Sequence, residues 1–154
     1  MKFNVFLIQI SLIEAAGYPA ETHIVTTEDG YILQLHRIPY SKNDLNVSAT
    51  RPVVFIQHGL MGTDEKYVLS WSKPTESLGE FQFLNLEFRQ CNVDIIILSL
   101  TINRPFGYHS IHNSTGYLLS DAGYDVWLGN FRGNYYSMAH QELDPEEFEF
   151  WDFG

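Results

Sequence analysis

Two stretches near the start of the chain predict a β-hairpin. Residues 22–27 and 31–38 are rich in β-branched and aromatic side chains, which are typical of strands. They flank the sequence EDG, a turn in which Gly30 can adopt a positive φ angle. We therefore expect an antiparallel pair of strands, followed by a polar surface loop over residues 40–51.

Two short apolar runs further along predict strands of a parallel sheet. Residues Val53–Gln57 are almost entirely apolar, as expected of a strand buried on both faces. Residues 116–122 have the pattern of a helix end, and Gly123 is placed to stop that helix. Residues 125–128 predict a second buried strand. A strand, a helix and a strand in this order form a right-handed parallel crossover, so the expected fold class is α/β.

The end of the chain has no comparable pattern. Residues 130–154 are dense in aromatic and acidic side chains, and we expect a loop-rich segment with at most a helical start near residues 144–147. No internal repeat or low-complexity tract is visible in the sequence.

Composition narrows the function classes. The 154 residues carry 19 acidic and 9 basic side chains, a formal net charge of -10, and no cluster of Lys and Arg. This argues against a nucleic acid or an anionic membrane as a partner held by a basic patch. Cys91 is the only cysteine, so the sequence excludes an intrachain disulfide and a zinc or iron–sulfur site made of cysteines.

The first sixteen residues allow two interpretations. Residues 1–16 contain Lys2, an interrupted apolar run and an Ala-Ala pair, which is typical of a short secretory signal. The alternative is that they begin the folded domain. The run is too short for a transmembrane segment, which takes roughly 20 apolar residues. Asn46 and Asn113 lie in glycosylation sequons, which agree with secretion but are individually weak indicators.

The loops after the two predicted parallel strands are the candidate chemical sites. His58, Gly59 and Leu60 follow the first strand directly, where a hydrolase needs backbone N–H donors facing a substrate carbonyl. The second strand leads into the sequence GNFRGN, which matches neither common nucleotide-binding glycine motif. We interpret that loop as structural and expect Arg132 to pair with a nearby acid.

Histidines and acids elsewhere are better explained without a metal or a cofactor, and we expect neither. The histidines interpreted as surface or strand residues are His23, His36, His109, His112 and His140. The acids interpreted as a solvated face, and not as a glycosidase pair, are Glu142, Asp144, Glu146, Glu147 and Glu149.

Three long motifs together resemble the acid lipase family, whose members include the gastric and lysosomal lipases. They are GYPAETHIVTTEDGYILQLHRIP, PVVFIQHGLMG and DAGYDVWLGNFRGN, and they occur in the order of the family. The resemblance implies the N-terminal portion of an α/β-hydrolase fold with an incomplete sheet. It also implies that the Leu60 N–H is an oxyanion-hole donor, that Gly59 keeps the approach free of a Cβ, and that His58 orients the turn.

The nucleophile of such a hydrolase is not in this sequence. No serine lies in a G-x-S-x-G frame, and by the resemblance the catalytic Ser, acid and His would all lie beyond Gly154. The resemblance also implies that the nucleophile-bearing strand pairs with the strand Val53–Gln57. We therefore expect an unpaired strand edge there, poor folding of the isolated chain and no lipase activity.

The resemblance divides the chain. It covers residues 12–78 and 116–153, which places an N-terminal lipase region at 17–79 and its continuation at 116–154. Residues 80–115 do not match the family, and they include a β-prone run over residues 93–100. Our hypothesis for this insert is translated intron or a misplaced exon boundary, and the alternative is a genuine loop insertion.

Together these observations predict the N-terminal fragment of a secreted or lysosomal lipase that cleaves lipid esters such as triacylglycerols or sterol esters. The alternative, from another class, is a noncatalytic truncated protein that binds lipid or a partner through exposed aromatic side chains.

Overall fold

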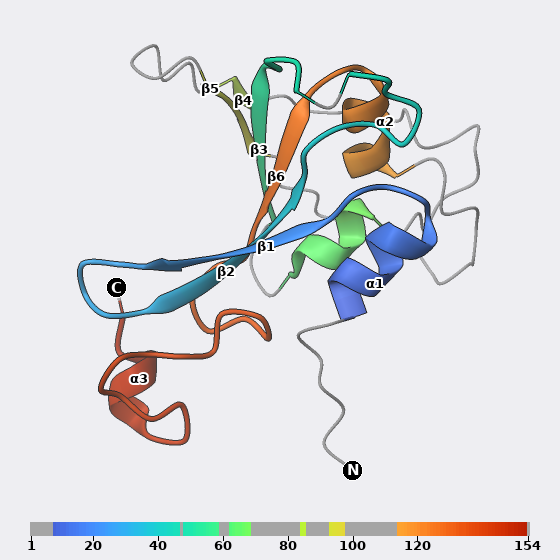
Figure 1. The fold of residues 1–154 in the computed structure, drawn as a ribbon. Helices are drawn as coiled ribbons and strands as arrows, with labels where there is room; N and C mark the ends of the chain where they lie inside the picture. The colour runs from blue at the N-terminus through green and yellow to red at the C-terminus, as the bar shows by residue number, and fades with distance from the viewer. Residues whose placement is uncertain are drawn as a thin grey trace.

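The computed structural model describes residues 8–46, 48–58, 62–68, 84–85, 93–97 and 114–153, with side chains for most of them. Figure 1 shows the arrangement of the helices and strands along the chain. The elements are α1 (Ile8–Ala15), β1 (Glu21–Thr26), β2 (Ile32–Ile38), β3 (Val53–Gln57), the 3-10 helix η2 (Asp64–Tyr67), β4 (Leu84–Asn85), β5 (Val93–Ile97), α2 (Thr115–Asp121), β6 (Asp125–Gly129) and α3 (Phe148–Trp151).

One mixed sheet organises these elements. Its strand order is β1-β2-β6-β3-β5-β4. Strands β6, β3 and β5 run parallel to one another, whereas β1, β2 and β4 are joined to their neighbours in antiparallel fashion. Parallel central strands with helices packed on them define the α/β class, so the expected fold class is confirmed.

The predicted hairpin is formed by β1 and β2. Their register runs from Glu21 opposite Arg37 to Thr26 opposite Ile32. The turn closes through a hydrogen bond of 3.0 Å from the Gly30 N–H to the Thr27 carbonyl, and Gly30 has a φ of 91°. An L side chain rarely adopts that angle, which is why the turn contains glycine.

The predicted unit of strand, helix and strand is also present. The carbonyl of Ser120 accepts the N–H of Gly123 at 3.0 Å, and the φ of 94° at this glycine ends α2 where the sequence predicts a stop. β6 follows and pairs in parallel with β3, from Val53 opposite Asp125 to Gln57 opposite Gly129.

The second edge of β3 differs from the expectation. The resemblance to lipases implies that this edge is unpaired, but β5 pairs with it in parallel, from Val53 opposite Val93 to Ile56 opposite Ile96. The prediction of an open edge is therefore wrong. β5 comes from the β-prone run of the insert, and such a run forms ladder hydrogen bonds wherever an edge is exposed.

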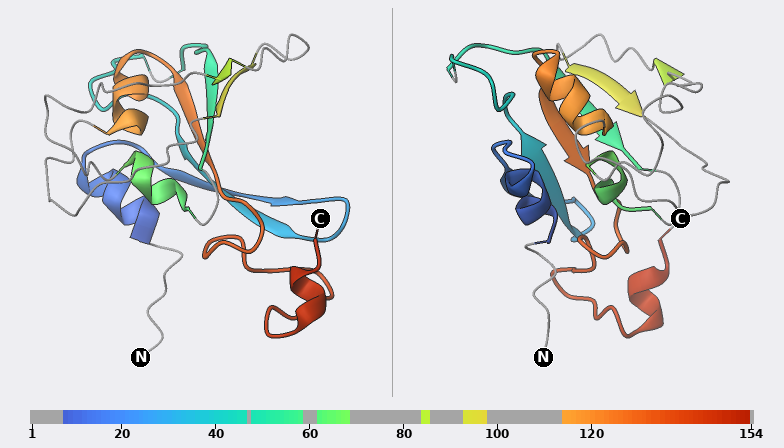
Figure 2. Two further views of the ribbon diagram at one scale, coloured as in Figure 1. Left: turned by 180° about the vertical axis from the view of Figure 1, so that it is seen from behind. Right: turned by 90° about the vertical axis from the view of Figure 1, so that its right-hand side faces the viewer.

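The helices cover one face of the sheet. Figures 1 and 2 show α1, η2 and α2 on the same side of the strands. Fully buried side chains join the two layers, namely Ile13, Ile38, Val54, Ile56, Tyr67, Val68, Tyr117, Val126 and Leu128. Along β3, Val54 and Ile56 point into this core, whereas Val53 and Phe55 are only half-buried. The expectation that β3 is buried on both faces is thus wrong for Val53 and Phe55.

The C-terminal arm, residues 141–153, packs against the tip of the hairpin (Figure 1). The Tyr31 hydroxyl donates a hydrogen bond of 2.5 Å to the Phe150 carbonyl, and the Gln141 N–H donates one of 3.0 Å to the Gly30 carbonyl. The helix in this arm, α3, starts at Phe148 and not near residue 144. An Asx turn, in which the Asp144 carboxylate accepts the Glu146 N–H at 2.9 Å, occupies the expected start.

Within the parts of the chain that the structure describes, none of the helices has the length and apolar character needed to cross a bilayer. The longest of the described helices, α1, has 8 residues.

Candidate functional site

Two polar loops meet at the carboxyl ends of β3 and β6. His58 follows β3 and Asn130 follows β6, and the last residues of the two strands, Gln57 and Gly129, are direct partners in the ladder. The side chains of His58 and Asn130 are both buried. Sites in open α/β sheets form at this edge, because the loops after neighbouring parallel strands converge there.

The His58 ring joins these loops. Its Nε2 atom lies 3.2 Å from the backbone nitrogen of Phe131 and 2.9 Å from the side-chain nitrogen of Asn134, and both nitrogens carry hydrogens. The Phe131 ring packs edge-on against the imidazole, with centroids 5.2 Å apart. The imidazole therefore holds the end of β3 against the GNFRGN loop. Gly59 and Leu60, the other predicted oxyanion-loop residues, lie outside the described residues.

Two asparagines organise the GNFRGN loop. The Asn130 amide donates to the Gln34 carbonyl at 3.2 Å, and its oxygen accepts the Asp64 N–H at 3.2 Å and the Asn134 amide at 2.7 Å. The Asn134 oxygen accepts the N–H groups of Tyr136 and Ser137 at 2.9 and 3.0 Å. The loop is thus fixed by side-chain amides, which supports its interpretation as structural.

A buried pair, His36 and Asp64, lies beside this loop. The Nδ1 atom of His36 is 2.5 Å from a carboxylate oxygen of Asp64, and both side chains are fully buried. On its other side, His36 Nε2 lies 2.8 Å from the amide nitrogen of Gln34, and the Tyr136 ring packs edge-on at 5.1 Å. Burial raises the pKa of Asp64, against the opposing effect of the hydrogen bond with His36.

The second Asp64 oxygen, Oδ1, has no hydrogen-bond partner among the described residues. The next residue, Glu65, accepts a hydrogen bond from the Tyr136 hydroxyl. Burial, followed by that hydrogen bond, raises the pKa of Tyr136. The 3-10 helix is therefore tied to both β2 and the segment after β6.

The sequence alone indicates only one residue of this pair. It places His36 correctly on a strand, but it assigns no role to Asp64, which lies 28 positions away. One indication is present in the sequence. Gln34, His36 and Ile38 share one face of β2 because side chains alternate along a strand, and the apolar Ile38 marks that face as the buried one. A histidine on a buried face needs a polar partner.

His23, His140 and Arg132, which the sequence also drew attention to, make contacts within the fold. Glu21 forms a hydrogen bond of 2.8 Å with His23. The His140 ring accepts the N–H groups of Glu142 and Leu143 at 3.0 Å. Arg132 pairs with Asp29, as expected, and its guanidinium also lies over the Tyr31 ring at 4.4 Å.

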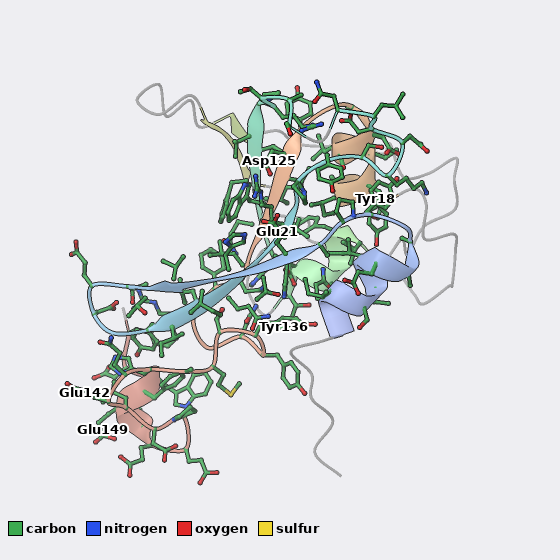
Figure 3. All side chains as sticks on the ribbon, viewed as in Figure 1. Tyr18, Glu21, Asp125, Tyr136, Glu142 and Glu149 are labelled. Carbon is green, nitrogen blue, oxygen red and sulfur yellow. The ribbon has the colours of Figure 1, made fainter. Side chains whose placement is uncertain are left out.

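The predicted acidic face is confirmed. All five of its residues are exposed, and Figure 3 shows two of them, Glu142 and Glu149, on the C-terminal arm. Among the glycosylation candidates, Asn46 is exposed. His109, His112 and Asn113 lie outside the described residues. In the described part of the chain, no group of three or more His, Cys, Asp and Glu side chains could hold a metal ion.

A cavity of about 370 Å³ lies at the opposite end of the sheet, beside Glu21, Arg37, Arg51 and Asp125. Asp125 is the first residue of β6 and Glu21 the first of β1, and Figure 3 labels both residues. The Arg37 guanidinium is paired with both acids, at 2.8 Å to Asp125 and 2.9 Å to Glu21. These pairs raise the pKa of Arg37. The positive charge of Arg37 is therefore already compensated by the two acids beside it.

The parallel strands at the centre of the sheet, the helices on one face and the polar loops at the carboxyl edge define the class of the chain, which is part of an α/β fold. A comparison with protein families then shows which kind of α/β fold the chain is similar to. The family described as "Partial alpha/beta-hydrolase lipase region" matches residues 10–71.

Curated relatives give the same result. The chain is 39% identical to the gastric triacylglycerol lipase of Bos taurus over 137 residues, 41% identical to the lipase lipl-1 of Caenorhabditis elegans over 138, and 34% identical to lipase member M of Mus musculus over 148. These matches cover 89%, 89% and 96% of this chain, but only 25%, 24% and 26% of the relatives. The chain is therefore the N-terminal part of an acid lipase family member and spans about a quarter of the length of its relatives.

Proposed function

We propose that the complete protein hydrolyses carboxylic esters of lipids, such as triacylglycerols or sterol esters, and that this chain supplies the oxyanion loop. The observation that carries the proposal is the junction of His58 with the loop after β6 at the carboxyl edge of the sheet, since His58 lies inside residues 10–71, which match the lipase region. In ester hydrolysis an N–H group in such a place stabilises the negative oxygen of the transition state. The Leu60 N–H is the proposed donor, with Gly59 leaving room for the substrate.

The 154-residue chain on its own is proposed to be inactive. It has no serine in a G-x-S-x-G frame, and acyl transfer by this fold requires an activated nucleophile at that elbow. Hydrolysis of a short-chain ester that disappears when one serine of this chain is replaced would contradict the proposal. Activity that no serine substitution removes would be a contaminant.

The proposed donor can be tested in the complete protein by replacing Leu60 with proline, which has no N–H. We expect the kcat for a triacylglycerol of short chain length to fall about 10²–10³-fold. Leu60→Ala is the matched control, because it shortens the side chain and keeps the N–H. Equal activity of the proline and alanine variants would contradict the role of the Leu60 N–H.

We propose that Ile13 and Ala16 belong to the folded domain. Ile13 is fully buried in the core, and the Ala16 carbonyl accepts a hydrogen bond of 3.3 Å from Lys42. Cleavage near residue 16 would remove the buried Ile13. N-terminal sequencing of the mature protein tests this, since a product that starts after Ala16 would contradict it.

We propose that the complete protein is secreted or lysosomal. The gastric triacylglycerol lipases among its relatives and the exposed Asn46 sequon support this. Mass spectrometry of the protein from its source would detect a glycan on Asn46.

The insert of residues 80–115 is proposed to be absent from the active lipase, as retained intron or a misplaced exon boundary. Transcripts that join codon 79 to about codon 116 and continue to a G-x-S-x-G elbow would support this. Transcripts that retain the insert would contradict it and favour a genuine insertion, in which β5 is a permanent part of the sheet.

A noncatalytic lipid- or partner-binding role is the second candidate. It is favoured by exposed aromatic side chains after β6 and on α3, namely Phe131, Tyr135, Phe148 and Trp151. Co-sedimentation of the chain with neutral phosphatidylcholine vesicles tests the lipid form of this role, and Phe148→Ser with Trp151→Ser should abolish the co-sedimentation. Failure of the wild-type chain to co-sediment would contradict it.

A further inference from the structure

The contacts of the His58 ring restrict its protonation state. Phe131 and Asn134 both direct N–H groups at Nε2, at 3.2 and 2.9 Å. A nitrogen that accepts hydrogen bonds must present its lone pair, so it cannot carry a proton of its own. The neutral imidazole then has its single hydrogen on Nδ1.

The amide of Asn134 is held in the orientation that makes it a donor. Its oxygen is already engaged by the N–H groups of Tyr136 and Ser137 at 2.9 and 3.0 Å. An inverted amide would place its NH₂ group against those two N–H donors. The Asn134 nitrogen therefore faces both His58 Nε2 and, at 2.7 Å, the Asn130 oxygen, and it can donate one hydrogen to each.

We propose that Asn134 is a positioning residue that keeps His58 neutral, with Nε2 as a hydrogen-bond acceptor, and thereby fixes the start of the loop after β3. In this arrangement His58 does not serve as a general base, because its Nε2 lone pair is committed to the GNFRGN loop. The meaning of this positioning for ester hydrolysis rests on the proposed function. The protonation state of His58 does not.

The same geometry connects the loop to η2. Asn130 accepts the Asp64 N–H at 3.2 Å on one side and the Asn134 amide on the other. The segment between β3 and η2 is thus held at His58 and at Asp64 by two neighbouring asparagines of one loop. Both asparagines therefore hold this segment in place, and neither needs to take part in catalysis.

The test is ¹⁵N nuclear magnetic resonance of histidine-labelled chain at neutral pH, with the His58 signals assigned from their loss in His58→Gln. In the wild type we expect the unprotonated ring-nitrogen signal at Nε2. Asn134→Asp retains the oxygen that caps Tyr136 and Ser137 but replaces the donor with a carboxylate oxygen, so we expect Nε2 to become protonated. Asn46→Asp is the matched control, because it adds the same charge at an exposed position and should leave the His58 signal unchanged.

A protonated Nε2 in the wild type, or an unchanged His58 signal in Asn134→Asp, would overturn the proposal. A second measurement avoids dependence on that variant. A glutamine amide can accept hydrogen bonds where Nε2 does, and leucine cannot, so His58→Gln should lower the melting temperature by less than half the amount that His58→Leu does. Equal losses would overturn the proposal. If these tests succeed while the complete protein hydrolyses no ester, the proposed function fails and the role of Asn134 stands.

Discussion

Replacing Asp64 with alanine is expected to reduce the free energy of unfolding by about 3–5 kcal/mol, the typical cost of removing one partner from a buried charged or hydrogen-bonded pair. The variant leaves the fully buried His36 Nδ1 without the carboxylate that lies 2.5 Å away. It also leaves a cavity beneath the GNFRGN loop. Urea unfolding at neutral pH measures the difference.

Asp44→Ala is the matched control. Like Asp64, Asp44 is paired with a basic side chain, in this case Arg51. The Asp44 side chain, however, is partly open to solvent. A pair with one partner partly in solvent contributes less to stability than a fully buried one, so this variant should lose less than Asp64→Ala. Similar losses for the two variants would contradict the importance assigned to the buried pair.

The Asp64 carboxyl group also predicts a pH dependence. Because burial raises its pKa, the folded state binds this proton more strongly than the unfolded state does. The part of the stability that comes from binding this proton is therefore present below the ordinary pKa of Asp and is lost as the pH rises through the raised value, whereas the contact with His36 is a separate contribution. The groups that face the carboxyl and its helix are His36, Asn130, Glu65 and Tyr136.

Asp64→Asn tests this dependence, because the amide keeps the shape of the carboxyl and cannot titrate. We expect its unfolding free energy, followed from acidic to neutral pH, to fall less steeply than that of the wild type. Identical pH profiles would show that the Asp64 carboxyl has the same pKa in the folded and unfolded states, contrary to the burial argument.

Replacing Ile96 with proline is expected to remove β5 from the sheet and cause the chain to self-associate. In the register of the sheet, Ile96 lies opposite Ile56 of β3 on one side and Asn85 of β4 on the other. Proline has no N–H and is confined to sheet edges, so it cannot stay in a strand with neighbours on both sides. The parallel edge of β3 would then be open, and open edges are templates for association. Size-exclusion chromatography of Ile96→Pro beside the wild type would detect this self-association.

Ile96→Ala is the control for this variant, since alanine retains the backbone N–H and leaves the ladder intact. We expect the alanine variant to elute as the wild type does. If the proline variant also elutes unchanged and unfolds cooperatively, then β5 does not protect the edge of β3, and the pairing has no role in keeping the chain soluble.

Local patterns were sufficient for the elements whose residues lie close together in the sequence. The hairpin of residues 21–38 follows from strand-forming residues around a glycine turn, and the end of α2 follows from Gly123. The adjacency of His58 and the GNFRGN loop was implied by a general rule, because each follows one of two parallel strands. The donor role of Leu60 stays a prediction, since that residue lies outside the described part of the chain.

Two of the expectations that failed have different causes. The run at residues 93–100 was predicted to be β-prone, but the sequence does not say which edge a strand will join, and in the structure its residues 93–97 form β5 and join β3. The start of α3 was displaced because an Asx turn at Asp144 competes with the first helical turn. In the first case a pairing between distant residues decided the outcome, and in the second a local side-chain hydrogen bond did.

The sequence by itself determined the α/β class, the hairpin, the parallel pair β3 and β6, and membership in a lipase family, because these depend on hydrophobic periodicity, turn residues and motif order. Only the tertiary structure decided that His36 is paired with Asp64, that Asn134 directs its amide at His58, and that β5 covers the edge of β3. Those contacts join residues 28, 76 and about 40 positions apart. They depend on register and on the burial of polar groups, which no local pattern specifies.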